Sequence, residues 1–233
     1  MSIGTTSLAL VDHTSRFLST SLGRDKANRF VQFFSKFIAW YLSKVGGNPD
    51  TIKRLSALSA TLSQSRKLMA VGRQLEFLSA ISKSRAINDP FLRYATILKS
   101  VALMGWLSFD TIQWIHGAGV LQHPDIKLVS DRAMKWWLAS LVVSLAGSLY
   151  RFRINSNKLA LETSSEKSAS DGANVKALYR DRASITLAIA QDAFDILIPC
   201  SALQYTSLDQ GYVAAAGTIT SLIGAYVQWR NVQ

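Results

Sequence analysis

The sequence predicts an all-α integral membrane protein, in which an N-terminal amphipathic helical hairpin precedes apolar C-terminal helices. One observation is the uneven charge: residues 1–93 hold 14 Lys and Arg against 5 Asp and Glu, whereas residues 94–233 hold 12 against 10. The other is the apolar pattern, which has helical spacing in the basic part and forms long runs in the remainder. A basic amphipathic segment joined to an apolar one suits an anionic membrane surface and its interior.

Turn signals divide the chain into four regions. Gly46-Gly47 ends one predicted helix, Asn48-Pro49 begins the next, and Asn88-Asp89-Pro90 breaks the chain again. The predicted regions are 1–88, a basic amphipathic region with helices near 7–22, 24–45 and 49–85; 89–154, an apolar helical pair; 155–182, a flexible polar loop rich in Ser, Asn and charge; and 183–233, a C-terminal apolar helical pair.

The predicted helix 24–45 has a wide aromatic face. Arg29, Gln32, Lys36 and Ser43 form a narrow polar stripe, and large apolar side chains cover the rest of the helix. Such a face more often packs against other helices than binds a cofactor. The packing residues predicted on it are Phe30, Phe34, Phe37 and Tyr41.

The predicted helix 49–85 is basic and carries two apolar stripes on opposite sides. A straight helix cannot press both stripes onto one flat surface. Either the helix breaks around Ser63–Lys67, or one end faces a membrane while the other packs on protein. A basic amphipathic helix of this kind is typical of a membrane-surface or partner-binding element, and a solvated helix of a soluble bundle is an equal alternative on this segment alone. The first stripe is Leu55, Leu58, Leu62 and Met69, and the second is Leu68, Val71, Leu75 and Leu78.

Residues 211–229 are the best candidate for a transmembrane helix. They are uncharged throughout and end at Trp229-Arg230, an interfacial anchor pattern. The apolar runs 94–115, 133–150 and 184–203 are weaker candidates, because they contain charges, are short or are interrupted by proline. Small residues also recur four apart in the last run, which favours helix association with itself or with another span. These residues are Ala216, Gly217, Thr220 and Gly224.

No recognisable catalytic motif is present. The sequence lacks a Walker loop, GxGxxG, GxSxG and HExxH, and its three histidines have no partner at metal-ligand spacing. We therefore expect no enzyme, no cofactor and no metal site. The single cysteine, Cys200, excludes an intramolecular disulfide. Asp192 and Asp195 share one helix face and could serve an ion path, although helix pairing, for example with Lys99, is the simpler interpretation.

Three stretches together resemble one family. GRDKANRFVQFFSKFIAWYL (Gly23 to Leu42) resembles the N-terminal signature of the peroxin eleven family of peroxisomal membrane proteins. SRKLMAVGRQLEFL (Ser65 to Leu78) resembles the membrane-active amphipathic helix of that family, and LDQGYVAAAGTITSLIGAYVQWR resembles its closing stretch. The resemblance covers nearly the whole chain in the same order and is weakest over 155–182.

The resemblance implies a protein that elongates and tubulates the peroxisomal membrane before organelle division. The amphipathic helix would insert into the cytosolic leaflet of an anionic phospholipid membrane, and the protein would form a homo-oligomer. Dynamin-type fission machinery and a membrane-protein import receptor are the implied partners, and both termini are implied to be cytosolic. The implied inserted residues are Leu68, Met69, Val71, Leu75 and Leu78, with Arg66, Lys67 and Arg73 on lipid headgroups. The first stripe, with Leu55 and Leu62, would then pack on the aromatic face of 24–45.

Two other functions stay open. A pore or channel for small metabolites is motivated by Lys99, Asp110, Asp192 and Asp195, which lie inside apolar runs. A soluble basic bundle that binds nucleic acid is disfavoured by residues 211–229, so we expect no nucleic-acid partner. The number of spans, two or four, and the side on which 155–182 lies are not fixed by these patterns.

Overall fold

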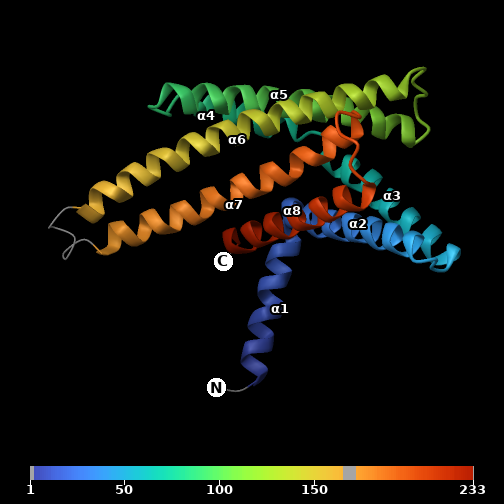
Figure 1. The fold of residues 1–233 in the computed structure, drawn as a ribbon, viewed down its shortest axis with the longest axis horizontal. Coiled ribbons are helices and arrows are strands. Elements are labelled where there is room, and N and C mark those ends of the chain that lie inside the picture. The colour runs from blue at the N-terminus through green and yellow to red at the C-terminus, as the bar shows by residue number, and fades with distance from the viewer. Residues whose placement is uncertain (1–2, 165–171, 233) are drawn as a thin grey trace.

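The computed structural model describes residues 3–164 and 172–232, which form eight helices and no strand (Figure 1). The all-α prediction is therefore confirmed. The helices are α1 (Ile3–Ser19), α2 (Ser21–Lys44), α3 (Pro49–Ala70), α4 (Gln74–Ser84), α5 (Pro90–Gly117), α6 (Ile126–Ser164), α7 (Gly172–Ala202) and α8 (Gln210–Asn231).

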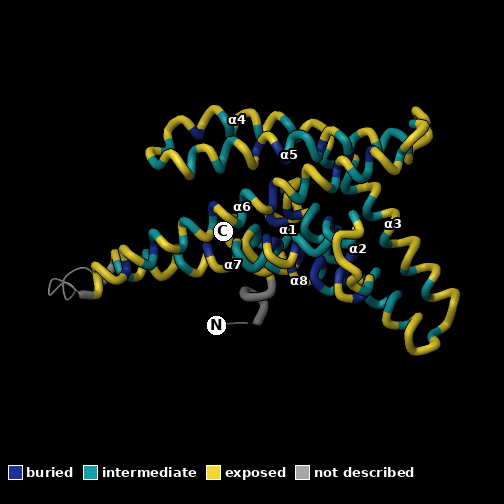
Figure 2. The backbone as a smooth tube through the Cα atoms, turned by 45° about the horizontal axis from the view of Figure 1, so that its top comes forward, coloured by how far each residue is buried: buried dark blue, intermediate teal, exposed yellow. Residues whose placement is uncertain are grey.

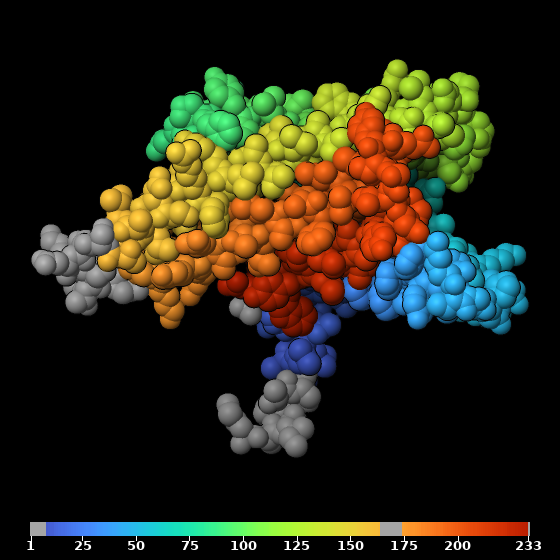
Figure 3. All heavy atoms as spheres, in the orientation of Figure 1, coloured from blue at the N-terminus to red at the C-terminus, as the bar shows by residue number. Residues whose placement is uncertain are grey.

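Most helices pack as neighbours along the chain. α4 lies on α5, α5 on α6 and α6 on α7, while α2 packs against both α3 and α8 (Figure 1). α1 projects from this body, as the space-filling view shows (Figure 3). It is held at its C-terminal half, where the His13 ring stacks on Trp229 with a centroid distance of 4.0 Å and Phe17 lies beside the same indole.

The predicted loop 155–182 is incorrect over most of its length. α6 continues to Ser164 and α7 begins at Gly172, so the two helices form a long antiparallel hairpin; residues 165–171 lie outside the described part of the chain. Pairing of the two helices stabilises this polar segment. Asn155 Nδ2 donates a hydrogen bond to the Leu178 carbonyl at 3.2 Å, and Leu159 is buried. The Ser- and Asn-rich composition favoured a loop prediction, because composition does not reveal tertiary contacts of this kind.

The predicted helix 49–85 is divided in two. α3 runs to Ala70, beyond the expected break at Ser63–Lys67, and the chain bends at Val71–Arg73. Val71 is extended, and Gly72 has a φ of +87°, in the left-handed region that favours glycine. The second half of the second apolar stripe, Leu75 and Leu78, therefore lies on α4, whose axis differs from that of α3.

The polarity of the molecule is inverted relative to a water-soluble bundle. Charged and hydroxyl side chains are buried, including Arg29, Asp110, Asp192, Asp195 and Thr220, while many large apolar side chains are exposed. Buried charges require partners, and extensive exposed apolar area marks an interaction site or a lipid surface. Figure 2 shows that buried positions are scarce along α4 and α5.

The interface between α2 and α3 follows this inverted pattern. The predicted polar stripe of α2 is divided between two neighbours: Arg29 pairs with α7, whereas Gln32, Lys36 and Ser43 line a groove of about 510 Å³ between α2 and α3, together with serines of α3. The aromatic face points elsewhere: Phe34 and Tyr41 are exposed, whereas Phe30, Phe37, Leu55 and Leu62 are half-buried. Trp40 of α2 and Ile52 of α3 line the same groove, so polar and apolar side chains share this interface.

Among the described residues, one helix is long and apolar enough by length and composition to cross a membrane, at Asn174–Ala202. The preference for 211–229 is thus corrected, because an uncharged run rich in Gly, Ala, Thr and Ser is only moderately apolar. The aspartates of α7 do not weaken it as a candidate. Both of them are buried, so they do not interrupt its outer surface.

Candidate functional site

An exposed apolar surface covers the end of α3 and the first half of α4. Leu68 lies near the end of α3, Val71 lies at the bend, and Leu75 and Leu78 lie one turn apart on α4. All four side chains are exposed, and that of Leu75 reaches 70%. The fifth predicted inserting residue, Met69, is half-buried, and its sulfur lies 3.8 Å from Asn28 Nδ2.

Arg66 and Lys67 point into the protein rather than away from it. Arg66 Nε donates to Asp25 at 2.9 Å, and its Nη1 donates to Gln32 at 2.8 Å. Lys67 Nζ lies 3.3 Å from Asp110 Oδ1 on α5. In this conformation both residues fix the end of α3 to its neighbours, so the expectation of headgroup contacts is revised for them.

Arg73, the third predicted headgroup residue, lies at the bend. Its Nε is 3.4 Å from Glu76 Oε2, which is mostly exposed. A surface pair of this kind contributes little to stability and leaves the guanidinium accessible.

A buried ion pair joins α2 to α7. Arg29 Nη2 lies 2.5 Å from Asp195 Oδ1, and both side chains are 6% exposed. Together with Arg66–Asp25 and Lys67–Asp110, this pair links four helices through charge. We call Asp25, Lys26, Arg29, Arg66, Lys67, Asp110 and Asp195 the buried charge cluster.

The cluster changes the titration of its members. Burial and the neighbouring Arg29 lower the pKa of Lys26 to about 8. Burial alone would raise the pKa of Asp25, but Arg66 and Lys26 more than offset this and hold that pKa below its ordinary value. The interior thus keeps Asp25 charged and makes Lys26 easy to neutralise.

The small-residue stripe of α8 packs on α2 of the same chain. A Cβ at Gly217 would collide with the Phe33 ring, and one at Gly211 would collide with Trp40. At Gly224 it would meet Lys26 Cδ at 3.1 Å. Ala216 and Thr220 are buried beside them. The predicted association surface is therefore occupied intramolecularly.

Sequence reasoning missed the Arg29–Asp195 pair and assigned Arg29 to a polar outer stripe. A signal was present, since an aspartate in an apolar helix needs a cationic partner. Lys99 was the example given of a partner for Asp192 and Asp195. It donates to Ser144 Oγ at 2.8 Å, and its charge acts on Asp192, while Asp195 pairs with Arg29. The true partners are separated by 166 positions, so the sequence alone offers several equivalent choices of cation.

The fold and these surfaces define an all-helical protein with a charged interior and an apolar exterior. Residues 11–229 match the family model described as Peroxisomal biogenesis factor 11 (PEX11), and the chain belongs to this family. The predicted family resemblance is thus confirmed.

Several named relatives are similar over most of their length. Peroxisomal biogenesis factor 11 of Schizosaccharomyces pombe is 28% identical over 93% of this chain and 94% of its own. Peroxisomal membrane protein PMP27 of Saccharomyces cerevisiae is 25% identical over 92% of each chain. Human Peroxisomal membrane protein 11B is 23% identical over 62% of this chain and 56% of its own. No solved structure matches the chain.

Proposed function

We propose that the protein remodels the peroxisomal membrane, elongating and tubulating it before the organelle divides. The observation that carries this proposal is the exposed apolar surface formed by Leu68, Val71, Leu75 and Leu78. The names of the relatives support the choice of the peroxisome as the organelle and of its membrane as the site of action.

The mechanism is asymmetric insertion. A helix lying about 5–10 Å deep in one leaflet expands that leaflet relative to the other and favours curvature. Full burial of each leucine side chain contributes roughly 1.5–3 kcal/mol. The bend at Gly72 lets α4 lie in the interface while α3 stays attached to α2 and α5 through Arg66 and Lys67.

The family resemblance supports the remaining parts of the proposal. The membrane is anionic, α4 enters the cytosolic leaflet, both termini are cytosolic, and the protein self-associates. Dynamin-type fission machinery and a membrane-protein import receptor are the proposed protein partners.

Tubulation by the full chain tests the proposal. The wild type, reconstituted with anionic vesicles of phosphatidylcholine mixed with phosphatidylserine, should produce tubules in electron micrographs. The variant Leu75→Glu, Leu78→Glu should not, because two carboxylates oppose insertion.

The matched control is Asn157→Glu, Ala160→Glu, which adds the same two charges at exposed positions of α6. This control should tubulate as the wild type does. Normal tubulation by the α4 variant would contradict the mechanism.

A pore or channel for small metabolites is the second candidate function. One observation favours it: Asp192 is buried in α7, and its Oδ2 makes no hydrogen bond within the described residues. A flux assay in proteoliposomes tests it. Solute flux that Asp192→Asn leaves unchanged would remove this residue from a conduction path.

A further inference from the structure

Six arginines that are distant in sequence lie at one level of the molecule. They are Arg85 after α4, Arg93 in the first turn of α5, Arg151 and Arg153 of α6, and Arg180 and Arg182 of α7. We call them the arginine belt.

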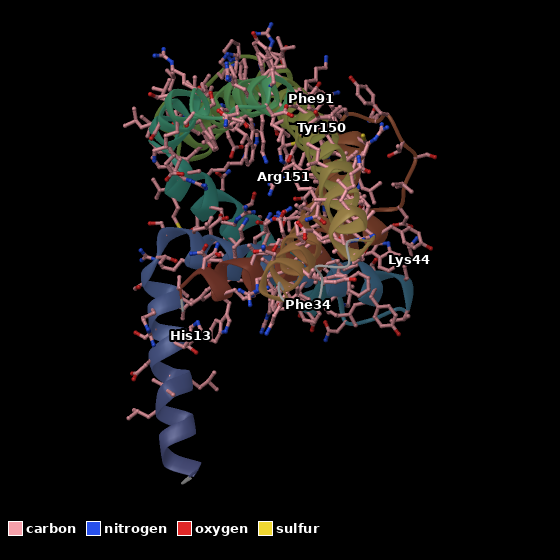
Figure 4. All side chains as sticks on the ribbon, turned by 90° about the vertical axis from the view of Figure 1, so that its left-hand side faces the viewer. His13, Phe34, Lys44, Phe91, Tyr150 and Arg151 are labelled. Atoms are coloured by element: carbon pink, nitrogen blue, oxygen red, sulfur yellow. The ribbon has the colours of Figure 1, made fainter. Side chains whose placement is uncertain are left out.

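Side-chain contacts set this level. Tyr150 Oη donates to Asp89 Oδ2 at 3.0 Å, and the Phe91 and Tyr150 rings are 4.6 Å apart, which aligns the start of α5 with this part of α6. Arg151 Nη2 lies 3.5 Å from Asp181, and Arg182 lies over the ring of Phe152, which aligns α7. Figure 4 shows Phe91 next to Tyr150, with Arg151 below them.

The belt divides surfaces of opposite character. On one side, α5 and α6 expose large apolar residues: Tyr94, Leu98, Val101, Val142 and Leu149. On the other side, the outer part of the α6–α7 hairpin exposes Asn157, Lys158 and Lys176, with Leu161 and Tyr179 as exceptions. Lys99, the cation within the apolar side, is hydrogen-bonded to Ser144.

The belt is also positively charged. Asp89 and Asp181 lie among its six arginines, which leaves a net charge of +4 (6 minus 2). Both acids have partners: Asp89 caps α5 and accepts from Tyr150, and Asp181 accepts from Arg151. Arg153 and Arg180 are exposed and make no ion pair with any described residue. Two guanidinium groups are therefore available to an anion.

We propose that the arginine belt binds the phosphate groups of anionic phospholipids and marks the level at which the chain leaves the hydrocarbon. Guanidinium groups bind phosphate in a bidentate manner, and aromatic residues such as Phe91, Tyr94 and Tyr150 are enriched at this depth. This proposal rests on the proposed membrane function, and it assigns headgroup contact to arginines other than Arg66 and Arg73.

The length of the apolar zone agrees between two helices. The uncharged stretch 136–150 of α6 spans about 22 Å. On α5, the stretch from Arg93 to Trp106 spans about 20 Å, and Trp106 stacks on Trp137 of α6 with a centroid distance of 5.3 Å. A zone shorter than a ~30 Å hydrocarbon core is accommodated by thinning and by snorkelling arginines.

Vesicle partitioning of the full chain tests the lipid contact. The measured quantity is the ratio of two partition coefficients, one for vesicles of phosphatidylcholine mixed with phosphatidylserine and one for phosphatidylcholine alone. Each cation at an anionic surface contributes roughly a factor of five, so Arg153→Gln, Arg180→Gln should lower the ratio about 25-fold. The variant Arg153→Lys, Arg180→Lys keeps both positive charges and should therefore retain most of the wild-type ratio.

The matched control is Lys158→Gln, Lys176→Gln, which removes the same charge one to two turns farther along the hairpin. Its loss should stay below about fivefold, because screening acts over about 10 Å. An equal or larger loss in this control would place the contact on the outer hairpin and overturn the proposal. Removal of the preference by soluble glycerol 3-phosphate at constant ionic strength would also overturn it, because the site would then serve a free phosphate.

Depth measurements separate failure of the belt from failure of the proposed function. Spin labels are placed at Leu149→Cys and Asn157→Cys on a Cys200→Ser background. Oxygen, which concentrates in the hydrocarbon, should relax the spin label at position 149 more strongly. A soluble nickel complex, which stays in water, should relax the spin label at position 157 more strongly. If the protein binds vesicles but both labels are in water, the belt proposal alone is overturned. If the protein does not bind vesicles at all, the proposed membrane function is overturned.

Discussion

Arg29 and Asp195 show how single residues hold this fold together. Each is a charge that would be costly to bury alone, and each finds its partner on a helix that is distant in the sequence. The same holds for Arg66 with Asp25 and for Lys67 with Asp110. Removal of one partner should therefore cost more than the pair itself contributes.

Asp195→Asn should destabilise the protein by about 3–5 kcal/mol, because it leaves Arg29 buried without a carboxylate. Thermal unfolding in detergent, followed by circular dichroism, measures the change. The control is Asp181→Asn, which removes an exposed pair with Arg151 and should cost less than about 1 kcal/mol. Equal losses in the two variants would refute the buried role of Asp195.

Lys26 should make stability depend on pH. Its folded pKa of about 8 lies below the ordinary value of 10.5, so between these values the unfolded chain holds a proton that the folded protein has released. Stability should therefore rise with pH through this window, by up to about 3 kcal/mol from this group.

Lys26→Met should remove that rise and should increase stability at pH 7. The groups that surround Lys26 are Asp25, Arg29, Arg66 and Asp195, and they are unchanged in the variant. Chemical denaturation at pH 7 and pH 10 provides the comparison. A rise in the variant as steep as that of the wild type would assign the pH dependence to other groups.

At the scale of helices, the close contact of α8 with α2 depends on the absence of a side chain. Gly217→Ala should destabilise the protein by about 1–3 kcal/mol, since the added methyl meets the buried Phe33 ring. Gly147→Ala is the matched control, because its methyl would meet only Ala95 Cβ at 3.7 Å.

The control should be neutral or slightly stabilising, because alanine has the higher helix propensity. Unfolding in detergent again supplies the measurement. A neutral Gly217→Ala would show that α8 and α2 do not approach as closely as described.

The sequence patterns located most helices but misplaced their faces. Capping and turn residues such as Asn48-Pro49 and Asp89-Pro90 act locally, so the starts of α3 and α5 were predictable. The hairpin formed by 155–164 and 172–182 was not, because it depends on contacts such as Asn155 with Leu178. A break in the predicted helix 49–85 was one of two expectations, but its position at Gly72 became known only from the backbone geometry.

The polarity of the whole molecule explains why the exposed apolar surface could be predicted better than the core. An exposed apolar stripe such as Leu75 and Leu78 is visible in helical periodicity, whatever surrounds it. The interior was harder to predict, because the usual rule assigns Arg29, Gln32 and Lys36 to the outside. In this molecule Arg29 is buried, whereas Phe34 and Tyr41 of the aromatic face are exposed.

This polarity, with charges inside and apolar surfaces outside, agrees with the membrane location that the names of the relatives give. The exposed surface of α4 and the apolar zone beside the arginine belt lie on neighbouring helices, since α4 packs on α5. A lipid phase that covers one of them is thus in position to cover the other.

The most direct test is the environment of residue 75 in the full chain. An environment-sensitive NBD fluorophore is attached at Leu75→Cys on a Cys200→Ser background, with Asn157→Cys as the control position. On anionic vesicles that contain phosphatidylserine, we expect a blue shift at position 75 and stronger quenching by a spin label near the headgroup than by one deep in the bilayer, with no shift at position 157. An unshifted, aqueous emission at position 75, on protein that floats with the vesicles, would contradict the insertion of α4.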